Sequence, residues 1–371
     1  ATFDSNSNKV VLVAKDNSND EGVAFVGTVS GTSISFGSSV SFGEGIGTVT
    51  SFPFCTFDSN SNKVVVIYRY HNGSSFSGRC KVGTVSGTSI SFGSEAQFQT
   101  NNVVTDGITF DNNSNKVVIL YKHNDDSSKG KCIVGTVSGT SISFGTAVEF
   151  TTGNSRPQTL TFDSNSNKVV IAYSDNTNAN YLAAVVGTVS GTSISFGSKV
   201  AIANDTFTDS AIVFETQSNQ IVIAYTDGNS TDVGRIVAGT VSGTSITFGT
   251  IIEYNSRVRS SSMAFDPDTN QIALSFGAIN NSTKGTVKMI VPKGLATFFK
   301  WIGFASAAIS DTATGTINVL GGINESQSSL EVGSTYYLSN TATLTTTVTS
   351  GREVGKALSA TKLLITQGSV T

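Results

Sequence analysis

The sequence is poor in charge, in histidine and in long apolar runs. Asp, Glu, Lys and Arg make up 13% of the 371 residues, and the formal net charge is -3. Because binding to a phosphate backbone needs clustered Lys and Arg, we expect no nucleic acid as a partner. No run of about 18 apolar residues occurs, so the sequence predicts no membrane insertion.

Motifs for metal or cofactor chemistry are also missing. The two histidines, His71 and His123, have neither a Cys nor a second His at ligand spacing. The sequence contains no GxSxG elbow, phosphate-binding glycine loop or HExxH pattern. We therefore predict no metal site and no cofactor.

Three cysteines leave an odd count, which is compatible with a metal or redox site. Their places in the internal repeat described below indicate another role. Cys55 stands where other copies have Ile, Leu or Met, and Cys80 and Cys132 stand where other copies have Ala or Ile. We therefore predict buried, unreactive thiols that fill core positions.

An internal repeat dominates the sequence. The phrase GTVSGTSISFG begins at Gly27 and returns, almost unchanged, at Gly83, Gly135, Gly187 and Gly239. The aromatic residue of a second phrase, TFDSNSNKV, falls at Phe3, Phe57, Phe110, Phe162, Phe214 and Phe265, with spacings of 54, 53, 52, 52 and 51 residues. A period in this range is typical of one supersecondary unit in a repeat architecture.

Each repeat has the pattern of four antiparallel strands. In the fourth copy, the first strand ends at Asp163, a tight turn capped by Asp and Asn side chains follows, and a second strand runs from Lys168 to Tyr173. The third strand passes through Gly187 to Val189, and the fourth runs from Thr192 to Phe196 and a few residues beyond. Gly191 lies between them, in a short turn that needs a positive φ.

Four-stranded repeats of this length predict an all-β fold: a β-propeller of about six four-stranded antiparallel blades, followed by a small C-terminal β domain. The propeller is assigned to residues 1–292, with repeats starting near 1, 55, 108, 160, 212 and 263. A linear β-solenoid is the alternative, although its coils are usually shorter. The sixth repeat lacks the SGTSISFG arm, so a closed ring would need a strand from before Ala1, and a further segment there would make seven blades.

The connections between strands fall into two classes, which a propeller places on opposite faces. The turns SNSN and VSG are nearly invariant, whereas the connections from second to third strand and from fourth to next first strand vary in length and chemistry. Varied loops on a rigid disc are how such scaffolds present a binding surface, although loops that are merely solvated also vary. The candidate ligand-binding residues on this varied face are Tyr70, His71, His123, Asp125, Arg156, Asp175, Tyr181, Asp209, Asp227, Arg257 and Arg259.

Carboxylates on the same face keep an enzymatic alternative open. A glycosidase needs two carboxylates across a pocket, and Asp106, Asp209 and Glu44 lie in suitable connections. No spacing in the sequence singles out a pair of them, so we predict no catalytic residues and a protein that binds without catalysing a reaction.

After about Pro292 the period stops, and residues 293–371 form a Gly-, Thr- and Ser-rich segment. Strand-like alternation occurs at Gly315 to Leu320, Thr335 to Leu338 and Lys362 to Ile365. We predict a separate small β domain for assembly or attachment.

Two parts of the chain resemble a known class of proteins. The segment IGFASAAISDTATGTINVLGGINE, with GSTYYLSNTATLTTT and VGKALSATKLLI after it, resembles a C-terminal module of tail-fibre and other virion structural proteins of tailed bacteriophages. The repeat TFDSNSNKVVIAY...VGTVSGTSISFGS is similar to repeats in predicted structural proteins of marine phages. The resemblance implies a virion appendage that contacts other virion proteins and the host surface and is a homo-oligomer, often a trimer in fibres.

Residues and resemblance together predict a non-enzymatic phage appendage protein, located in the virion, whose loops bind a host-surface glycan or protein. Three alternatives stay open: a structural decoration or spacer protein of the virion, a propeller depolymerase, and a bacterial surface adhesin. Planar amides, carboxylates and aromatic rings suit the hydroxyls and apolar faces of sugars.

Overall fold

The computed structural model describes residues 1–43, 53–229, 232–279, 284–290, 304–305, 317–318, 323–324, 328–338, 344–346 and 352–365. The first connection from a fourth to a first strand, with Glu44, lies outside these residues. The chain forms two compact units, Ala1–Ala296 and Thr297–Thr371, which are described separately.

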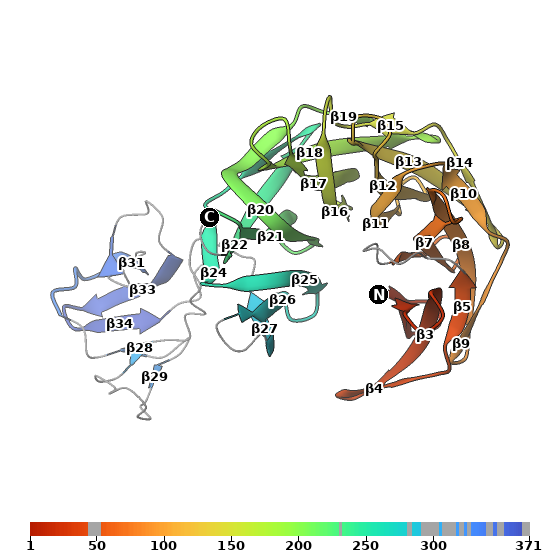
Figure 1. Ribbon diagram of the computed structural model, residues 1–371. Coiled ribbons are helices and arrows are strands. Elements are labelled where there is room, and N and C mark those ends of the chain that lie inside the picture. Colours follow the sequence, from red (N-terminus) through yellow and green to blue (C-terminus); the bar gives the residue numbers. More distant parts are fainter. Residues whose placement is uncertain are drawn as a thin grey trace. The chain divides into compact units, whose positions relative to one another are not determined.

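The first unit is a β-propeller of six blades around a common centre (Figure 1), as predicted. The first blade consists of β1 (Thr2–Asp4), β2 (Lys9–Asp16), β3 (Glu21–Ser30), β4 (Ser33–Phe36) and β5 (Val40–Gly43). The second consists of β6 (Phe54–Asp58), β7 (Lys63–His71), β8 (Phe76–Ser86), β9 (Ser89–Phe92) and β10 (Ala96–Gln99). The third consists of β11 (Val103–Asp111), β12 (Lys116–His123), β13 (Lys129–Ser138), β14 (Ser141–Phe144) and β15 (Val148–Glu149). The fourth blade consists of β16 (Ser155–Asp163), β17 (Lys168–Asp175), β18 (Tyr181–Ser190), β19 (Ser193–Phe196) and the start of β20 (Val200–Glu215). The fifth consists of the rest of β20 with β21 (Gln220–Asp227), β22 (Val233–Ser242), β23 (Ser245–Phe248) and β24 (Ile252–Asn255). The sixth consists of β25 (Val258–Asp266), β26 (Gln271–Ala278) and β27 (Lys284–Ile290).

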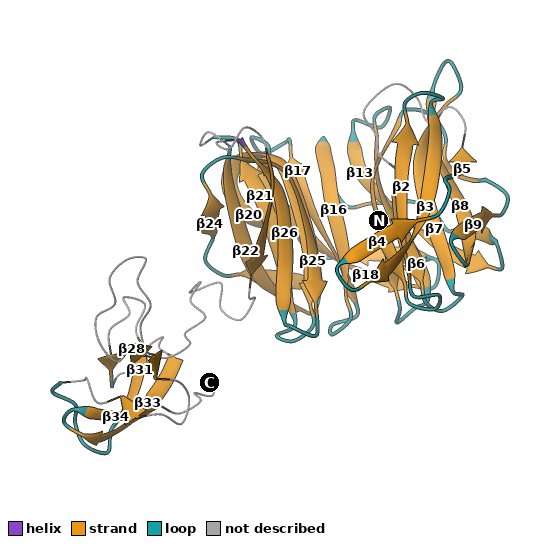
Figure 2. Cartoon of the chain, turned by 90° about the horizontal axis from the view of Figure 1, so that it is seen from below, coloured by secondary structure: helices purple, strands orange, loops and turns teal. Residues whose placement is uncertain are grey.

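The strands run between two faces of this unit (Figure 2), and the first strand of a blade, such as β11 or β16, lies nearest the centre in Figure 1. The fourth strand of each full blade is split into two segments that both pair with the third strand. Between them, the N–H of the repeat glycine, such as Gly145, donates to Val134 O of β13 at 2.9 Å. One expected loop is also absent. Residues 203–210 are one of the varied connections expected between a fourth strand and the next first strand. They belong instead to the continuous strand β20, because their backbone pairs first with β18 and then with β21.

The predicted tight turns are present. In the turn after β16, Asp163 Oδ1 accepts the N–H groups of Asn165 and Ser166 at 2.9 and 3.0 Å, and its Oδ2 accepts the Ser166 hydroxyl at 2.6 Å. Asn167 ends the turn in the left-handed region with a φ of +55°. Gly191, in the turn between β18 and β19, has a φ of +59°, which its missing side chain permits at little cost.

Neighbouring blades are joined by apolar contacts between facing sheets. One face of each blade and the opposite face of the next form a hydrophobic cluster at each of the five junctions. Four junctions contain an aromatic pair between the outer strand of one blade and the second strand of the next, such as Phe42 with Tyr68 at 5.4 Å between ring centroids. Each such pair contributes about 0.5–1.5 kcal/mol beyond the burial of its area.

The two end blades differ from the others. Ile34 and Phe36 of the first blade are 45% and 46% exposed, whereas the equivalent Ile194 of the fourth blade is 3% exposed because the preceding blade covers it. The first blade also carries Ala14 where the other blades carry the aromatic residue of the junction. The sixth blade has three strands, and within the described residues no fourth strand pairs with β27.

The second unit is also built of strands. Its described part contains β28 (Phe304–Ala305), β29 (Ile317–Asn318), β30 (Ile323–Asn324), β31 (Thr335–Leu338), β32 (Leu344–Thr345), β33 (Arg352–Ser359) and β34 (Lys362–Ile365). Five of them form one antiparallel sheet in the order β30-β34-β33-β31-β32. The predicted strands at Thr335 to Leu338 and Lys362 to Ile365 are confirmed as β31 and β34, and Leu330, Tyr336, Ala357 and Leu363 form a small core.

The cysteines occupy the predicted core positions. Cys80 and Cys132 are fully buried, Cys55 is partly buried, and none of the three forms a disulfide. Burial raises the pKa of each thiol, so the reactive thiolate is disfavoured.

Candidate functional site

The varied connections lie on one face of the propeller, which we call the loop face. It carries the connections between β2 and β3, β7 and β8, β12 and β13, β17 and β18, and β21 and β22, together with the starts of β11, β16 and β25. The opposite turn face carries the invariant turns. A shallow opening of about 330 Å³ lies on the turn face, lined mainly by the Thr and Phe residues that precede those turns.

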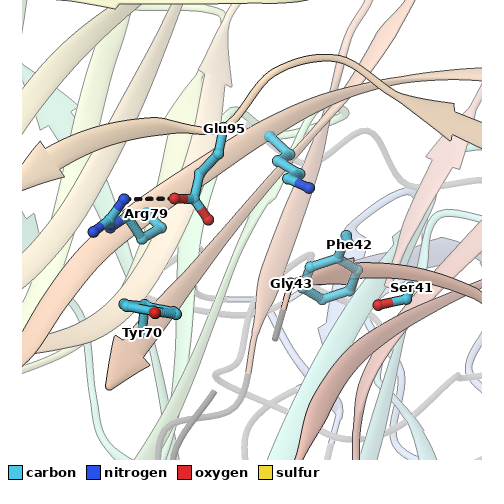
Figure 3. Close-up of a pocket in the computed structure, with 7 residues that line it drawn as sticks. Ser41, Phe42, Gly43, Tyr70, Arg79 and Glu95 are labelled. Carbon is cyan, nitrogen blue, oxygen red and sulfur yellow. Dashed lines mark hydrogen bonds and ion pairs between the residues drawn. The ribbon is translucent and has the colours of Figure 1, made fainter. Parts of the chain in front are cut away.

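A pocket of about 410 Å³ lies on the loop-face half of the first blade junction (Figure 3). It is lined by Ser41, Phe42 and Gly43 of β5, Tyr70 of β7, Arg79 and Lys81 of β8, and Glu95. We call it the junction pocket. Gly43 is needed there, because a Cβ at this position would lie 2.8 Å from the ring of Tyr68.

The polar groups of the junction pocket hold one another in place. Arg79 Nη1 donates to Glu95 Oε1 at 2.5 Å, and Arg79 Nε donates to the Ser77 hydroxyl at 3.0 Å. The guanidinium of Arg79 also lies 4.9 Å from the ring centre of Tyr70, within the range of a cation–π interaction. The Tyr68 hydroxyl donates to Glu95, and burial, with this hydrogen bond, raises the pKa of Tyr68. The pocket therefore combines a fixed carboxylate, fixed donors and an aromatic ring.

A second group of polar residues surrounds the loop-face end of the innermost strands. Each of the strands β11, β16, β20 and β25 has a β-bulge at about the same level. The bulged residues, which we call the axial bulges, are Asp106, Gln158, Thr208, Asp209, Ser260 and Ser261. Bulges interrupt the ladder and redirect side chains, and they are frequent beside functional sites.

Two carboxyl groups of the axial bulges have altered acidity. Burial raises the pKa of Asp106 to about 8, and the charges of Lys122, Arg156 and Arg69 limit this rise. Burial also raises the pKa of Asp209, against the opposing effects of the Ser261 N–H, 2.5 Å from Asp209 Oδ2, and of Arg156. Arg156 therefore acts on both carboxyl groups, and Asp106 is mostly protonated at neutral pH.

The structure places four predicted residues around the second and third blades. Tyr70 lines the junction pocket, and the His71 ring packs on Phe76 with 4.4 Å between ring centroids. His123 ends β12, and Asp125 lies in the next loop, where its Oδ1 accepts the Asn102 amide at 2.5 Å.

Three predicted residues of the fourth and fifth blades support the loops. Asp175 and Asp227 are 6% and 0% exposed, and they form ion pairs with Lys199 and Arg235. Tyr181 begins β18, opposite Asp175. A ligand would have to break these ion pairs to reach either carboxylate.

The remaining predicted residues approach the centre or the sixth blade. Arg156 and Asp209 belong to the cluster around the axial bulges. Arg257 is exposed before β25, and Arg259 is exposed with its Nη2 3.8 Å from Asp232 Oδ2.

Sequence reasoning missed Arg79, Glu95, Arg69 and Lys122. Arg69 and Lys122 carry a detectable signal, since each interrupts an otherwise apolar second strand directly after its Tyr. Arg79 and Glu95 have no such signal, because the pocket that they line forms only where β5 of the first blade lies beside the second blade.

No family model and no curated protein matches the chain. Among solved structures, the BP39L lectin from Burkholderia pseudomallei is similar, with a TM-score of 0.53 and 8% identity over 76% of this chain and 81% of the lectin. A putative 6-phosphogluconolactonase from Bacteroides uniformis has a TM-score of 0.49 and 13% identity, covering 78% of this chain and 84% of its own. Sqt1 from Chaetomium thermophilum has a TM-score of 0.48 and 13% identity, covering 79% and 68%. At such identities the likeness concerns the fold alone, and the chain is a β-propeller protein.

The described part of the chain contains neither a membrane-spanning helix nor a cluster of metal ligands. No helix in it has the length and apolar character needed to cross a membrane. No group of three or more His, Cys, Asp or Glu side chains in it is arranged to hold a metal ion.

Proposed function

We propose that this protein is a non-enzymatic appendage protein of a bacteriophage virion whose loop face binds a glycan on the host surface. The junction pocket carries this proposal. It offers an aromatic ring, a guanidinium and a carboxylate within one pocket of about 410 Å³, which suits a sugar residue.

The chemistry of the junction pocket matches sugar recognition. Glu95 can accept hydrogen bonds from hydroxyl groups, and Arg79 and Lys81 can donate them. The ring of Tyr70 offers an apolar surface for the C–H groups of a sugar. Because Arg79 and Glu95 are already paired, they lose little side-chain freedom when a ligand binds.

The virion role rests on the resemblance of the repeats and of residues 293–371 to phage structural proteins. In this proposal the second unit contacts other virion proteins and mediates homo-oligomerisation, and the loop face points outward. A map of the virion in which the loop face is buried against neighbouring subunits would favour the spacer alternative. Release of reducing sugar from host polysaccharide would favour the depolymerase.

Binding to a glycan array, followed by titration of the best ligand, tests the junction pocket. We expect Tyr70→Ala and Glu95→Gln each to weaken binding by about tenfold, equivalent to about 1.4 kcal/mol, because each removes one contact surface of the pocket. Glu149→Gln is the matched control, since Glu149 pairs with Lys129 at 3.0 Å away from this pocket. Equal affinity of all three variants and the unaltered protein would exclude the junction pocket as the site, and an array without any ligand would refute glycan binding.

A further inference from the structure

A cluster of charged residues surrounds Asp106 at the loop-face end of β11, and the junction pocket does not use it. We propose that this cluster binds the anionic group of an acidic sugar, between Asp106 and Arg156. The inference rests on the proposed glycan-binding function and specifies the class of glycan.

The cluster brings together cations from three blades. Arg69 of β7, Lys122 of β12 and Arg156 of β16 are all close enough to Asp106 to affect its charge. Arg69 is 6% exposed and its guanidinium lies 4.0 Å from the ring centre of Phe76, so it is held in place beneath the surface. Arg156 is exposed and is the residue that an incoming ligand can reach first.

Unsatisfied polar atoms lie at the same bulge. Thr105 is 3% exposed, and its hydroxyl has no hydrogen-bond partner among the described residues; the same holds for the buried Oδ2 of Asp106. In the fifth blade, the hydroxyl of Ser210 is likewise buried without a partner among these residues. A buried polar group without a partner is unfavourable, so a ligand that supplies the missing hydrogen bonds binds more tightly.

The positive charge of the residues around Asp106 favours an anionic ligand. With a pKa of about 8, Asp106 is mostly neutral at pH 7 and can donate a hydrogen bond, and the three side chains around it are basic. Arg156 presents a planar fork of donors that matches a carboxylate or a sulfate ester. A neutral sugar would leave these cations without a counter-charge from the ligand.

The other titratable groups near β11 do not reverse the positive charge of the cluster around Asp106. They comprise His123 of β12, Arg79 and Lys81 of β8, which line or flank the junction pocket, Asp58 at the turn-face end of β6, and Asp209 of β20 beyond Arg156. Among the described carboxyl groups other than Asp106, Asp209 is the one whose pKa is affected by Arg156, and burial raises that pKa.

The pH dependence follows from the protonation of Asp106. Above its pKa, Asp106 becomes negative, repels the anion and pairs with the same cations. The protonated fraction falls about tenfold between pH 7 and pH 9, and the affinity for an acidic sugar is expected to fall by about the same factor. Asp106→Asn stays neutral and keeps a donor, so it is expected to bind at pH 7 and to lose this pH dependence.

The experiment measures binding of a linear trigalacturonate, its carboxyl-reduced neutral trimer and a sulfated trisaccharide to the full chain by calorimetry at pH 7 and pH 9. We expect the neutral trimer to bind at least tenfold more weakly than one of the two acidic ligands, and Arg156→Gln to remove this preference. The trigalacturonate and sulfate arms distinguish the two kinds of anionic group. Lys168→Gln, which removes one positive charge on the turn face, should bind like the unaltered protein.

Equal binding of neutral and acidic trimers, or an acidic preference that is the same at pH 7 and pH 9 and survives Arg156→Gln, would overturn the inference. If the chain still binds host glycans through the junction pocket, the proposed function stands without it. Conversely, an acidic ligand that binds at Arg156, together with no binding to host cells, would remove the host-recognition role and leave the anionic site in place.

Discussion

The carboxylate at the end of each first strand closes the turn that follows it. Asp4, Asp58, Asp111, Asp163 and Asp266 accept backbone N–H groups two and three residues further on and a Ser or Thr hydroxyl. In the fifth blade a Glu, Glu215, accepts the equivalent groups from Gln217 and Ser218. One carboxylate in each blade thus satisfies three donors that the tight turn would otherwise leave without partners.

Replacing this carboxylate should destabilise the propeller. Asp163→Ala removes the acceptor of three hydrogen bonds at a residue that is 1% exposed, and we expect it to lower the free energy of unfolding by about 2–3 kcal/mol. Asp163→Asn keeps one acceptor oxygen and should lose less. Denaturant unfolding measures the difference, and an unchanged midpoint for Asp163→Ala would show that the turn does not depend on its carboxylate.

At the scale of the blade, the repeat glycine after the first half of the fourth strand allows close approach of the next blade. A Cβ on Gly37, Gly93, Gly145 or Gly197 would lie 1.8 to 2.2 Å from the backbone oxygen of the Thr in the next blade's last turn. Real Cβ atoms do not approach so closely, so a side chain here would separate the blades. Gly249 of the fifth blade meets no such atom, because the sixth repeat lacks the SGTSISFG segment that forms this turn in the other blades.

The chain therefore contains its own control for this contact. We expect Gly145→Ala to lower the melting temperature clearly, with a loss of about 2 kcal/mol or more, because the junction between the third and fourth blades must open. Gly249→Ala should change stability by less than about 0.5 kcal/mol. Calorimetric unfolding of both variants tests this, and similar losses for the two would mean that backbone freedom, not the blade contact, requires glycine.

At the scale of the whole molecule, the two units have separate hydrophobic cores. The five clusters of the blade junctions contain residues of the first unit alone, and the cluster around Leu330 and Leu363 contains residues of the second unit alone. Stability is then expected to divide between the two units.

Removal of residues 297–371 tests both this division and the proposed assembly role. The remaining propeller should keep its melting transition, because none of its core clusters is lost. Under the proposed function, the truncated chain should also lose oligomerisation while keeping sugar binding, which light scattering and calorimetry measure. A truncated chain that cannot fold, or that still forms the same oligomer, would contradict one of these two expectations.

Repetition in the sequence is sufficient to predict the blade and its turns. Five or six copies show the same alternation, the same Asp and the same Gly, and local physics requires them: a tight turn needs its acceptor and a positive φ needs glycine. The face that carries the variable connections follows from strand order alone, and so do Tyr70, Arg156 and Asp209 as candidates.

The environment of each copy is decided only by the tertiary structure. The phrase GTVSGTSISFG is the same in the first and fourth repeats, yet Ile34 is 45% exposed and Ile194 is 3% exposed, because only the latter is covered by a preceding blade. The junction pocket likewise combines residues of the first and second blades, and the cluster around Asp106 combines residues of the second, third and fourth blades. The distances between side chains of different blades depend on how the blades pack against one another, and no local pattern in the sequence encodes them.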